Sequence, residues 1–134
     1  MKPSVIAELI ASGREGDFWD FKRLPHDDNG DLLHDIICLA NSTARRPKYL
    51  IIGVADPAEG CAIVGLHAST PNRKRQHDYL DFLRSKRFAG DVRPTITLHT
   101  LDLDSRQIDV IEIDDTAQKP YFLTEDYGLS LIHI

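Results

Sequence analysis

An aspartate at the end of an apolar run is the first residue whose surroundings point to chemistry. The run covers residues 48–56 and ends with Asp56. Its aromatic and β-branched side chains are typical of a buried central strand, so we expect Asp56 where that strand meets a loop. A strand that carries a carboxylate to its end can build a site. The alternative interpretation is a solvated turn residue.

Asp20 and Lys22 form a second candidate pair. Residues 14–23 are predicted to be extended, and alternate residues of a strand share one face. Trp19 and Phe21 suit the packed face, which leaves Asp20 and Lys22 pointing together towards solvent or a cleft. An exposed ion pair that contributes little to stability is the alternative.

Two clusters of basic residues could contact phosphate groups. The formal net charge is −5, but residues 72–94 contain seven basic and three acidic residues, whereas residues 101–115 contain one basic and six acidic residues. A basic face and an acidic face are therefore expected. The bases that could line a groove for a nucleic-acid backbone are Arg45, Arg46, Lys48, Arg73, Lys74 and Arg75. A solvated charged face is the alternative.

Several common sites are absent from the sequence. It contains no GxxxxGK[ST] or GxGxxG phosphate-binding loop, no HExxH zinc motif and no GxSxG nucleophile motif. No apolar run approaches the roughly 18 residues of a membrane span, so no membrane partner is expected. Cys38 and Cys61 are interpreted as reduced, buried thiols of a cytoplasmic protein.

The 134 residues suit one domain with a single core. The pattern predicts an α+β fold with a mixed, mostly antiparallel sheet flanked by two main helices. Asp104 and Ser105 are expected to form the tight turn between the two longest strands. The expected helices cover residues 4–13, 31–44 and 73–87, and the expected strands cover residues 14–23, 48–56, 61–66, 95–103, 107–113 and 121–123.

The last six residues, 129–134, look foreign to the domain. Their sequence is a translation of a string that resembles the mosaic-end adapter of transposon-based sequencing libraries. We therefore predict a domain over residues 1–128 that is incomplete at its C-terminal end, followed by an adapter-encoded tail. A genuine short apolar tail is the alternative.

An ordered set of short motifs resembles the Schlafen AlbA-type domain, over roughly residues 8–128. The motifs are an acid–Phe–Lys strand at Asp20–Lys22, a helix end at Ala40–Ser42, the Gly53–Asp56 strand end, residues 63–66 and the Lys119–Tyr121 step. This resemblance implies a module that binds DNA or RNA within a bacterial regulator or defence protein. It also allows a homodimer and further domains beyond the C-terminal end.

The same resemblance implies a second activity. Some vertebrate members cut transfer and ribosomal RNA with three carboxylates and a divalent metal. By motif, these carboxylates fall on Glu15, Asp20 and Asp56, with Lys22 beside them, and their oxygens suit Mg²⁺ or Mn²⁺. The family usually has Glu at the position of Asp20, a glycine pair where residues 42–48 stand, and a closing Tyr-x-Arg-x-Gly segment that this chain lacks.

Three functions follow from these observations. Nucleic-acid binding through the six bases is the first. A metal-dependent endoribonuclease that uses Glu15, Asp20 and Asp56 is the alternative, and a protein-interaction domain is the third.

Overall fold

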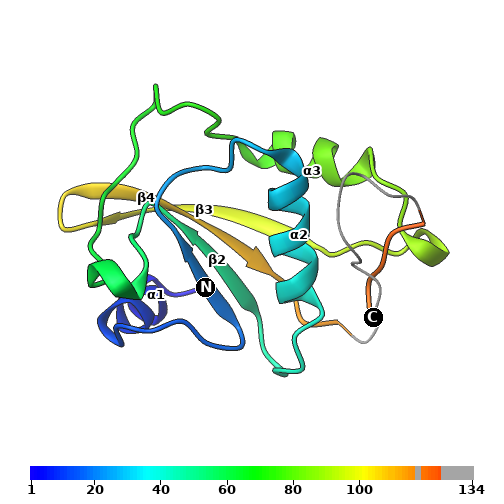
Figure 1. The fold of residues 1–134 in the computed structure, drawn as a ribbon, viewed down its shortest axis with the longest axis horizontal. Coiled ribbons are helices and arrows are strands. Elements are labelled where there is room, and N and C mark those ends of the chain that lie inside the picture. Colours follow the sequence, from blue (N-terminus) through cyan, green and yellow to red (C-terminus); the bar gives the residue numbers. More distant parts are fainter. Residues whose placement is uncertain (117–118, 125–134) are drawn as a thin grey trace.

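A mixed four-stranded sheet forms the centre of the molecule (Figure 1). The computed structural model describes residues 1–116 and 119–124. The spatial order of the strands is β1-β2-β4-β3; β1 and β2 are parallel, and the other two pairs are antiparallel. The predicted α+β class with a mixed, mostly antiparallel sheet is therefore confirmed. The elements in chain order are α1 (Pro3–Ala11), β1 (Trp19–Lys22), α2 (Asn29–Ala40), β2 (Lys48–Ile52), the 3₁₀ turn η1 (Pro57–Glu59), α3 (Gln76–Arg84), the 3₁₀ turn η2 (Ala89–Asp91), β3 (Ile96–Leu103) and β4 (Arg106–Ile113).

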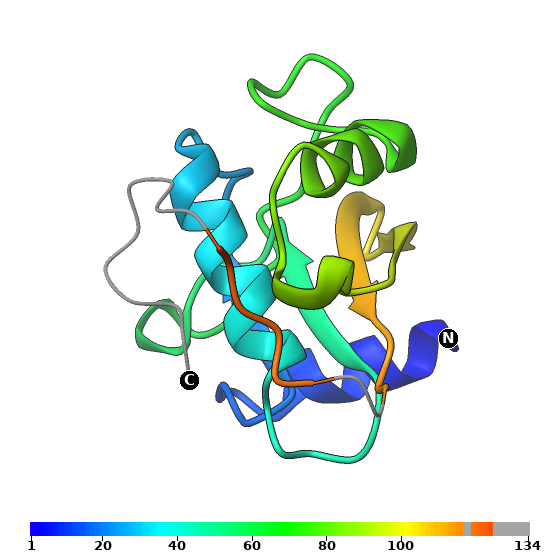
Figure 2. The ribbon, with the colours of Figure 1, turned by 90° about the vertical axis from the view of Figure 1, so that its right-hand side faces the viewer.

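The sheet separates two apolar clusters. On one face, the side chains of α2 and α3 pack against Leu50, Ile52 and Ile111. On the other face, Ile6 of α1 packs with Tyr49 and Ile51. Figure 2 shows α2 and α3 above α1. Each residue of β2 is buried, as expected for a strand that is covered on both faces.

The alternation of side chains along β1 places its polar residues on the predicted face. Trp19 and Phe21 are buried in the α1 cluster. Asp20 and Lys22 consequently point to the face that carries α2, where the ammonium group of Lys22 lies 3.4 Å from a carboxylate oxygen of Asp35 on α2.

Helix α2 ends at Ala40, four residues before the predicted end. The side-chain amide of Asn41 donates to the carbonyl oxygen of Tyr121 at 2.7 Å, and its oxygen accepts from the Tyr121 N–H at 2.6 Å. These two hydrogen bonds attach the backbone of Tyr121 to the C-terminal end of α2. The predicted strand 121–123 is not formed; only an isolated bridge joins Leu123 to Phe88.

The predicted strand 48–56 ends early, and its partner 61–66 is not a regular strand. Gly53 has a φ of +108°, and its carbonyl oxygen accepts hydrogen bonds from the N–H groups of both Val64 and Gly65. A Cβ at Gly53 would lie 3.2 Å from side-chain atoms of Ile108 and Leu66. Because the backbones approach so closely here, the expected hairpin ladder is replaced by two isolated bridges. One joins Val54 to Ile63, and the other joins Leu66 to Gln107.

The β3–β4 hairpin agrees with its prediction. Asp104 and Ser105 have φ values of 51° and 63°, the left-handed geometry of a tight two-residue turn. Helix α3 begins at Gln76 instead of Arg73. The Asp78 carboxylate accepts from the Arg75 N–H at 2.9 Å and caps the first turn.

The two cysteines differ in their exposure. Cys61 is buried, as predicted, but Cys38 is exposed, so the prediction for Cys38 is wrong. Cys38 lies on the solvent side of α2, where its Sγ is 3.5 Å from Nε2 of His34. The segment 129–134 lies outside the described residues, so its adapter origin stays a prediction. No helix in residues 1–116 or 119–124 is long and apolar enough to cross a membrane.

Candidate functional site

A pocket of about 590 Å³ gathers the four acidic and basic side chains that the sequence indicated. Glu15, Asp20, Lys22 and Asp56 all line it, together with residues of η1. Strands β1 and β2 are parallel and in register from Trp19–Tyr49 to Lys22–Ile52, so residues at and beyond their C-terminal ends lie side by side. The parallel pairing thus explains why Asp20 and Asp56, which are 36 positions apart in the sequence, line the same pocket.

Glu15 and Asp20 stand close enough to affect each other. Partial burial, followed by the hydrogen bond with Asp20 and the charge of Asp20, raises the pKa of the Glu15 carboxyl. A bound cation would favour the ionised form of both carboxyl groups and offset the repulsion between them. Their oxygens have the hard donor character that Mg²⁺ and Mn²⁺ prefer.

The third acid is arranged differently. One carboxylate oxygen of Asp56 accepts from the Glu59 N–H at 3.1 Å and caps η1. Within the described part of the chain, no three acidic, histidine or cysteine side chains lie close enough together to bind one metal ion. The donor chemistry fits a divalent cation, but the three carboxylates share a pocket without forming a ready ligand set.

Lys22 connects the pocket to two residues that the sequence analysis missed. Its ammonium group lies 3.6 Å from Asp20 and 3.4 Å from Asp35. The same oxygen of Asp35 lies 2.7 Å from Nε2 of His26. An acid between the apolar positions 32, 33, 36 and 37 of a helix was the signal that could have identified Asp35.

The charges of this network support one another. Burial opposes the positive charge of Lys22, but the carboxylates of Asp20 and Asp35 outweigh it and raise the pKa of Lys22. Burial likewise opposes ionisation of Asp35, yet the hydrogen bond with His26 and the charge of Lys22 lower the pKa of that carboxyl. The Lys22–Asp35 pair is therefore ionised at neutral pH.

Two of the six side chains that were predicted to contact phosphate, Lys48 and Arg73, are instead bound in ion pairs within the protein. Lys48 has no exposed side-chain surface, and its Nζ lies 2.9 Å from an Asp115 oxygen that also binds Lys119. Burial lowers the pKa of Lys48, and Asp115 opposes that shift. Arg73 is bound through Nε and an Nη atom to both oxygens of Asp109, at 2.9 and 3.0 Å. Each side chain is thus occupied inside the protein.

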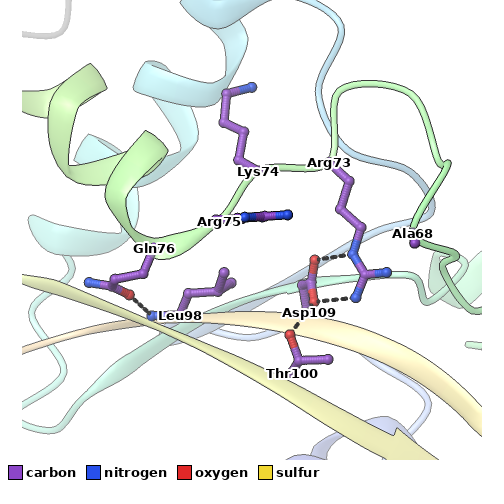
Figure 3. Close-up of a pocket in the computed structure, with 8 residues that line it drawn as sticks. All are labelled: Ala68, Arg73, Lys74, Arg75, Gln76, Leu98, Thr100 and Asp109. Carbon is purple, nitrogen blue, oxygen red and sulfur yellow. Dashed lines mark hydrogen bonds and ion pairs between the residues drawn. The ribbon is translucent and has the colours of Figure 1, made fainter.

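The Arg73–Asp109 pair lies in a second pocket of about 300 Å³ (Figure 3). Asp109 is 2% exposed and also accepts from the Thr100 hydroxyl at 2.8 Å. The hydrogen bond with Asp109 raises the pKa of Arg73. Figure 3 shows Arg73 reaching down to Asp109, Arg75 extending over the pocket and Lys74 pointing away from it.

Four predicted phosphate contacts remain accessible. Arg45 and Arg75 are exposed, and Arg46 and Lys74 are partly exposed. The Arg46 guanidinium lies over the Phe18 ring, 3.8 Å from its centroid. Among the described residues, none of the four cations has a carboxylate partner.

The accessible cations form two separate patches instead of the single groove that was expected. Arg45 and Arg46 precede the first residue of β2. Lys74 and Arg75 line the pocket around Asp109, which pairs with Ile52 at the last residue of β2. Arg46 packs on Tyr49 of the α1 face of the sheet, whereas Lys74 and Arg75 lie beside Leu98 on the face that carries α2 and α3. The two patches therefore lie at opposite ends of β2 and on different sides of the sheet.

Comparisons with known proteins agree with this fold. Over 96% of this chain and 84% of its own length, a solution NMR structure matches with a TM-score of 0.62 and 22% sequence identity. That structure is the N-terminal domain of a protein from Nitrosomonas europaea described as related to the ATP-dependent DNA helicase RecG. A search of curated protein sequences finds no significant match. The family described as Schlafen, AlbA_2 matches residues 15–133, and the chain therefore belongs to the Schlafen AlbA_2 family.

Proposed function

We propose that this domain binds nucleic acid through its two exposed cation patches. The observation that carries the proposal is that Arg45, Arg46, Lys74 and Arg75 lack carboxylate partners among the described residues, although acids outnumber bases in the chain. Unpaired arginine and lysine side chains supply the phosphate contacts of most nucleic-acid interfaces. Family membership and the helicase-related protein that shares the fold support the same proposal.

The two patches lie on different sides of the sheet, so each can contact its own stretch of phosphates. The patch before β2 can also contact a base. Arg46 adds a planar guanidinium on an aromatic ring, a surface on which a base can stack.

Charge reversal at the α3 patch tests the proposal. We expect a labelled 20-nucleotide RNA or DNA to bind the wild-type protein with an affinity that falls with salt. The double variant K74E/R75E should weaken binding and make the salt slope shallower by about one for each lost phosphate contact. Arg84→Glu is the control because Arg84 is an exposed base at the end of α3 and already pairs with Asp81. K74E/R75E reverses two charges and Arg84→Glu reverses one, so a loss of binding free energy no more than twice that of the control would reduce the result to net charge and contradict the proposal.

A second candidate function is metal-dependent cleavage of RNA in the carboxylate pocket. It is favoured by the shared pocket of Glu15, Asp20, Asp56 and Lys22. The three carboxylates would hold Mg²⁺ or Mn²⁺, which can activate water and stabilise charge on a phosphate. Lys22 would supply a positive charge to the same phosphate. Asp56 can bind the metal through the carboxylate oxygen that does not cap η1.

An incubation with structured RNA, with Mg²⁺, with Mn²⁺ and with chelator, tests this second function. Asp56→Asn keeps an oxygen for the η1 cap but removes the charge, so we expect it to abolish cleavage and preserve binding. Glu59→Gln is the matched control, because Glu59 lines the same pocket but pairs with Arg23. Cleavage that survives in Asp56→Asn would exclude the three-carboxylate mechanism. Absence of both binding and cleavage in the wild-type protein would leave a protein-interaction domain.

A further inference from the structure

We infer that Asp35 and His26 are positioning residues that hold the Lys22 ammonium group at the carboxylate pocket, where it contacts a phosphate of the bound nucleic acid. The inference rests on the proposed function for its ligand, but the arrangement of the three side chains is a separate observation. Nothing in the sequence motifs includes Asp35 or His26.

The first step concerns the place of Lys22. Its side chain is 36% exposed, and it lines the pocket with Glu15, Asp20 and Asp56. An unrestrained lysine has four rotatable bonds and loses conformational entropy when it is fixed. Asp20 at 3.6 Å and Asp35 at 3.4 Å flank the ammonium group. These two carboxylates confine the charge to the mouth of the pocket.

The second step concerns the difference between the two carboxylates. Asp20 belongs to the same strand as Lys22 and lines the pocket itself, so a bound cation would draw it away from Lys22. Asp35 belongs to α2 and does not line the pocket. Asp35 can therefore keep its contact with Lys22 while Asp20 takes part in binding.

The third step concerns His26. Its side chain is 7% exposed, and Nε2 lies 2.7 Å from the Asp35 oxygen that also contacts Lys22. A carboxylate oxygen accepts, so Nε2 donates. The other ring nitrogen, Nδ1, is buried and has no hydrogen-bond partner among the described residues. Buried polar atoms are normally paired, and Nδ1 lacks such a pairing within the described part of the chain. The hydrogen bond from Nε2 to Asp35 is therefore the described interaction that fixes the orientation of the His26 ring.

Asp35→Asn gives a test whose sign separates positioning from simple electrostatics. Removal of a negative charge from the surface should strengthen binding of a polyanion. Loss of the anchor for Lys22 should instead weaken it, by roughly twofold to fivefold for a partly exposed ion pair. We expect weaker binding of the 20-nucleotide RNA or DNA. In the Lys22→Met background, Asp35→Asn should no longer weaken binding.

Matched variants complete the experiment with the full chain. Asp31→Asn removes the same charge from an exposed position of α2 and should leave binding unchanged or slightly stronger. His26→Phe keeps a ring but removes the Nε2 donor, and it should weaken binding in the same direction as Asp35→Asn. Tighter or unchanged binding by Asp35→Asn, or weakening that persists without Lys22, would overturn the inference.

A second readout separates failure of the inference from failure of the proposed function. NMR relaxation of the Lys22 Cε group reports its order without any ligand. We expect lower order in Asp35→Asn than in the wild-type protein and in Asp31→Asn. If no oligonucleotide binds the wild-type protein, the proposed function is wrong and the phosphate contact falls with it. Unchanged order of Lys22 in Asp35→Asn would refute the positioning role itself.

Discussion

Arg73 and Asp109 form a bidentate ion pair beneath the start of α3, with both nitrogen–oxygen distances at or below 3.0 Å. The pair fastens the segment before α3 to the middle of β4. It also removes Arg73 from the cations that are available to a ligand. A basic run in the sequence thus contains one structural arginine and two accessible bases, Lys74 and Arg75.

This difference within the run predicts very unequal effects of two alanine substitutions on the free energy of unfolding. Arg73→Ala leaves the carboxylate of Asp109 buried with only the Thr100 hydroxyl as a donor, and loss of one partner from a buried pair typically costs about 3–5 kcal/mol. Arg75→Ala should change the free energy of unfolding by less than about 0.5 kcal/mol. Urea denaturation measures both. Equal stabilities of the two variants would contradict a structural role for Arg73.

Tyr79 predicts how stability changes in alkaline solution. Burial, followed by the negative charge of Asp109, raises the pKa of the Tyr79 hydroxyl. Above pH of about 10, the unfolded chain loses this proton while the folded protein keeps it. Stability is therefore fully present below that pH and falls as the pH rises, by up to about 1.4 kcal/mol per pH unit.

The variant Tyr79→Phe isolates this contribution, because the other tyrosines are common to both proteins. Its free energy of unfolding should decrease less steeply than that of the wild-type protein between pH 10 and 11. Chemical denaturation at several pH values measures the difference. Parallel pH profiles of the two proteins would show that Tyr79 ionises as readily in the folded state as in the unfolded chain.

The position of Arg46 over Phe18 predicts that the planar shape of the guanidinium contributes more to stability than its charge does. The guanidinium lies 3.8 Å from the centroid of Phe18 and 5.8 Å from that of Tyr49. Arg46→Ala should lower the free energy of unfolding by about 0.5–1 kcal/mol, and Arg46→Lys should recover only part of it, because an ammonium group cannot stack in a plane. Arg45→Ala is the control. A lower melting temperature for Arg45→Ala than for Arg46→Ala would contradict a stabilising stack of Arg46 on Phe18.

The sequence periodicity was sufficient to predict the four strands of the sheet and the faces of β1, but it also predicted strands at 61–66 and 121–123, where only isolated bridges form. Alternation alone predicted that Trp19 and Phe21 are packed and that Asp20 and Lys22 share the other face, and the structure agrees. It was not sufficient for side chains whose partners lie far along the chain. Lys48 shares the core face with Leu50, but its partner Asp115 lies 67 residues away, and no local pattern specifies that pairing.

The candidate site also combines residues that the sequence indicated with residues that only the folded structure brings together. The motif order indicated Glu15, Asp20 and Asp56; parallel pairing of β1 with β2 brings Asp20 and Asp56 to one pocket, and the turn closed by the Gly16–Trp19 bridge folds Glu15 back to it. The contacts of Lys22 with α2 depend on the angle at which that helix crosses the sheet, which a periodicity cannot give. Asp35 and its histidine partner therefore became visible only in three dimensions.

Glu15 predicts a conflict between stability and metal binding. Its pKa is raised by partial burial and then by Asp20, so ionisation of Glu15 at neutral pH opposes folding. Glu15→Gln removes one of the two charges, and the new amide can donate to Asp20. The variant should be more stable than the wild-type protein at pH 7. The difference should vanish below the ordinary glutamate pKa of about 4.3, where both proteins are uncharged at this position.

Addition of a divalent cation should reverse this order. Mg²⁺ or Mn²⁺ that binds only the folded protein raises its melting temperature, and removal of Glu15 takes away one ligand and half of the charge that Glu15 and Asp20 supply together. We expect the wild-type melting temperature to increase with Mn²⁺ and to return to its starting value with chelator. Glu15→Gln should show little increase, whereas Glu59→Gln at the rim of the same pocket should behave as the wild type does. Equal responses of all three proteins would mean that the cation binds elsewhere, and the pair of carboxyl groups would then raise the pKa of Glu15 without serving a metal.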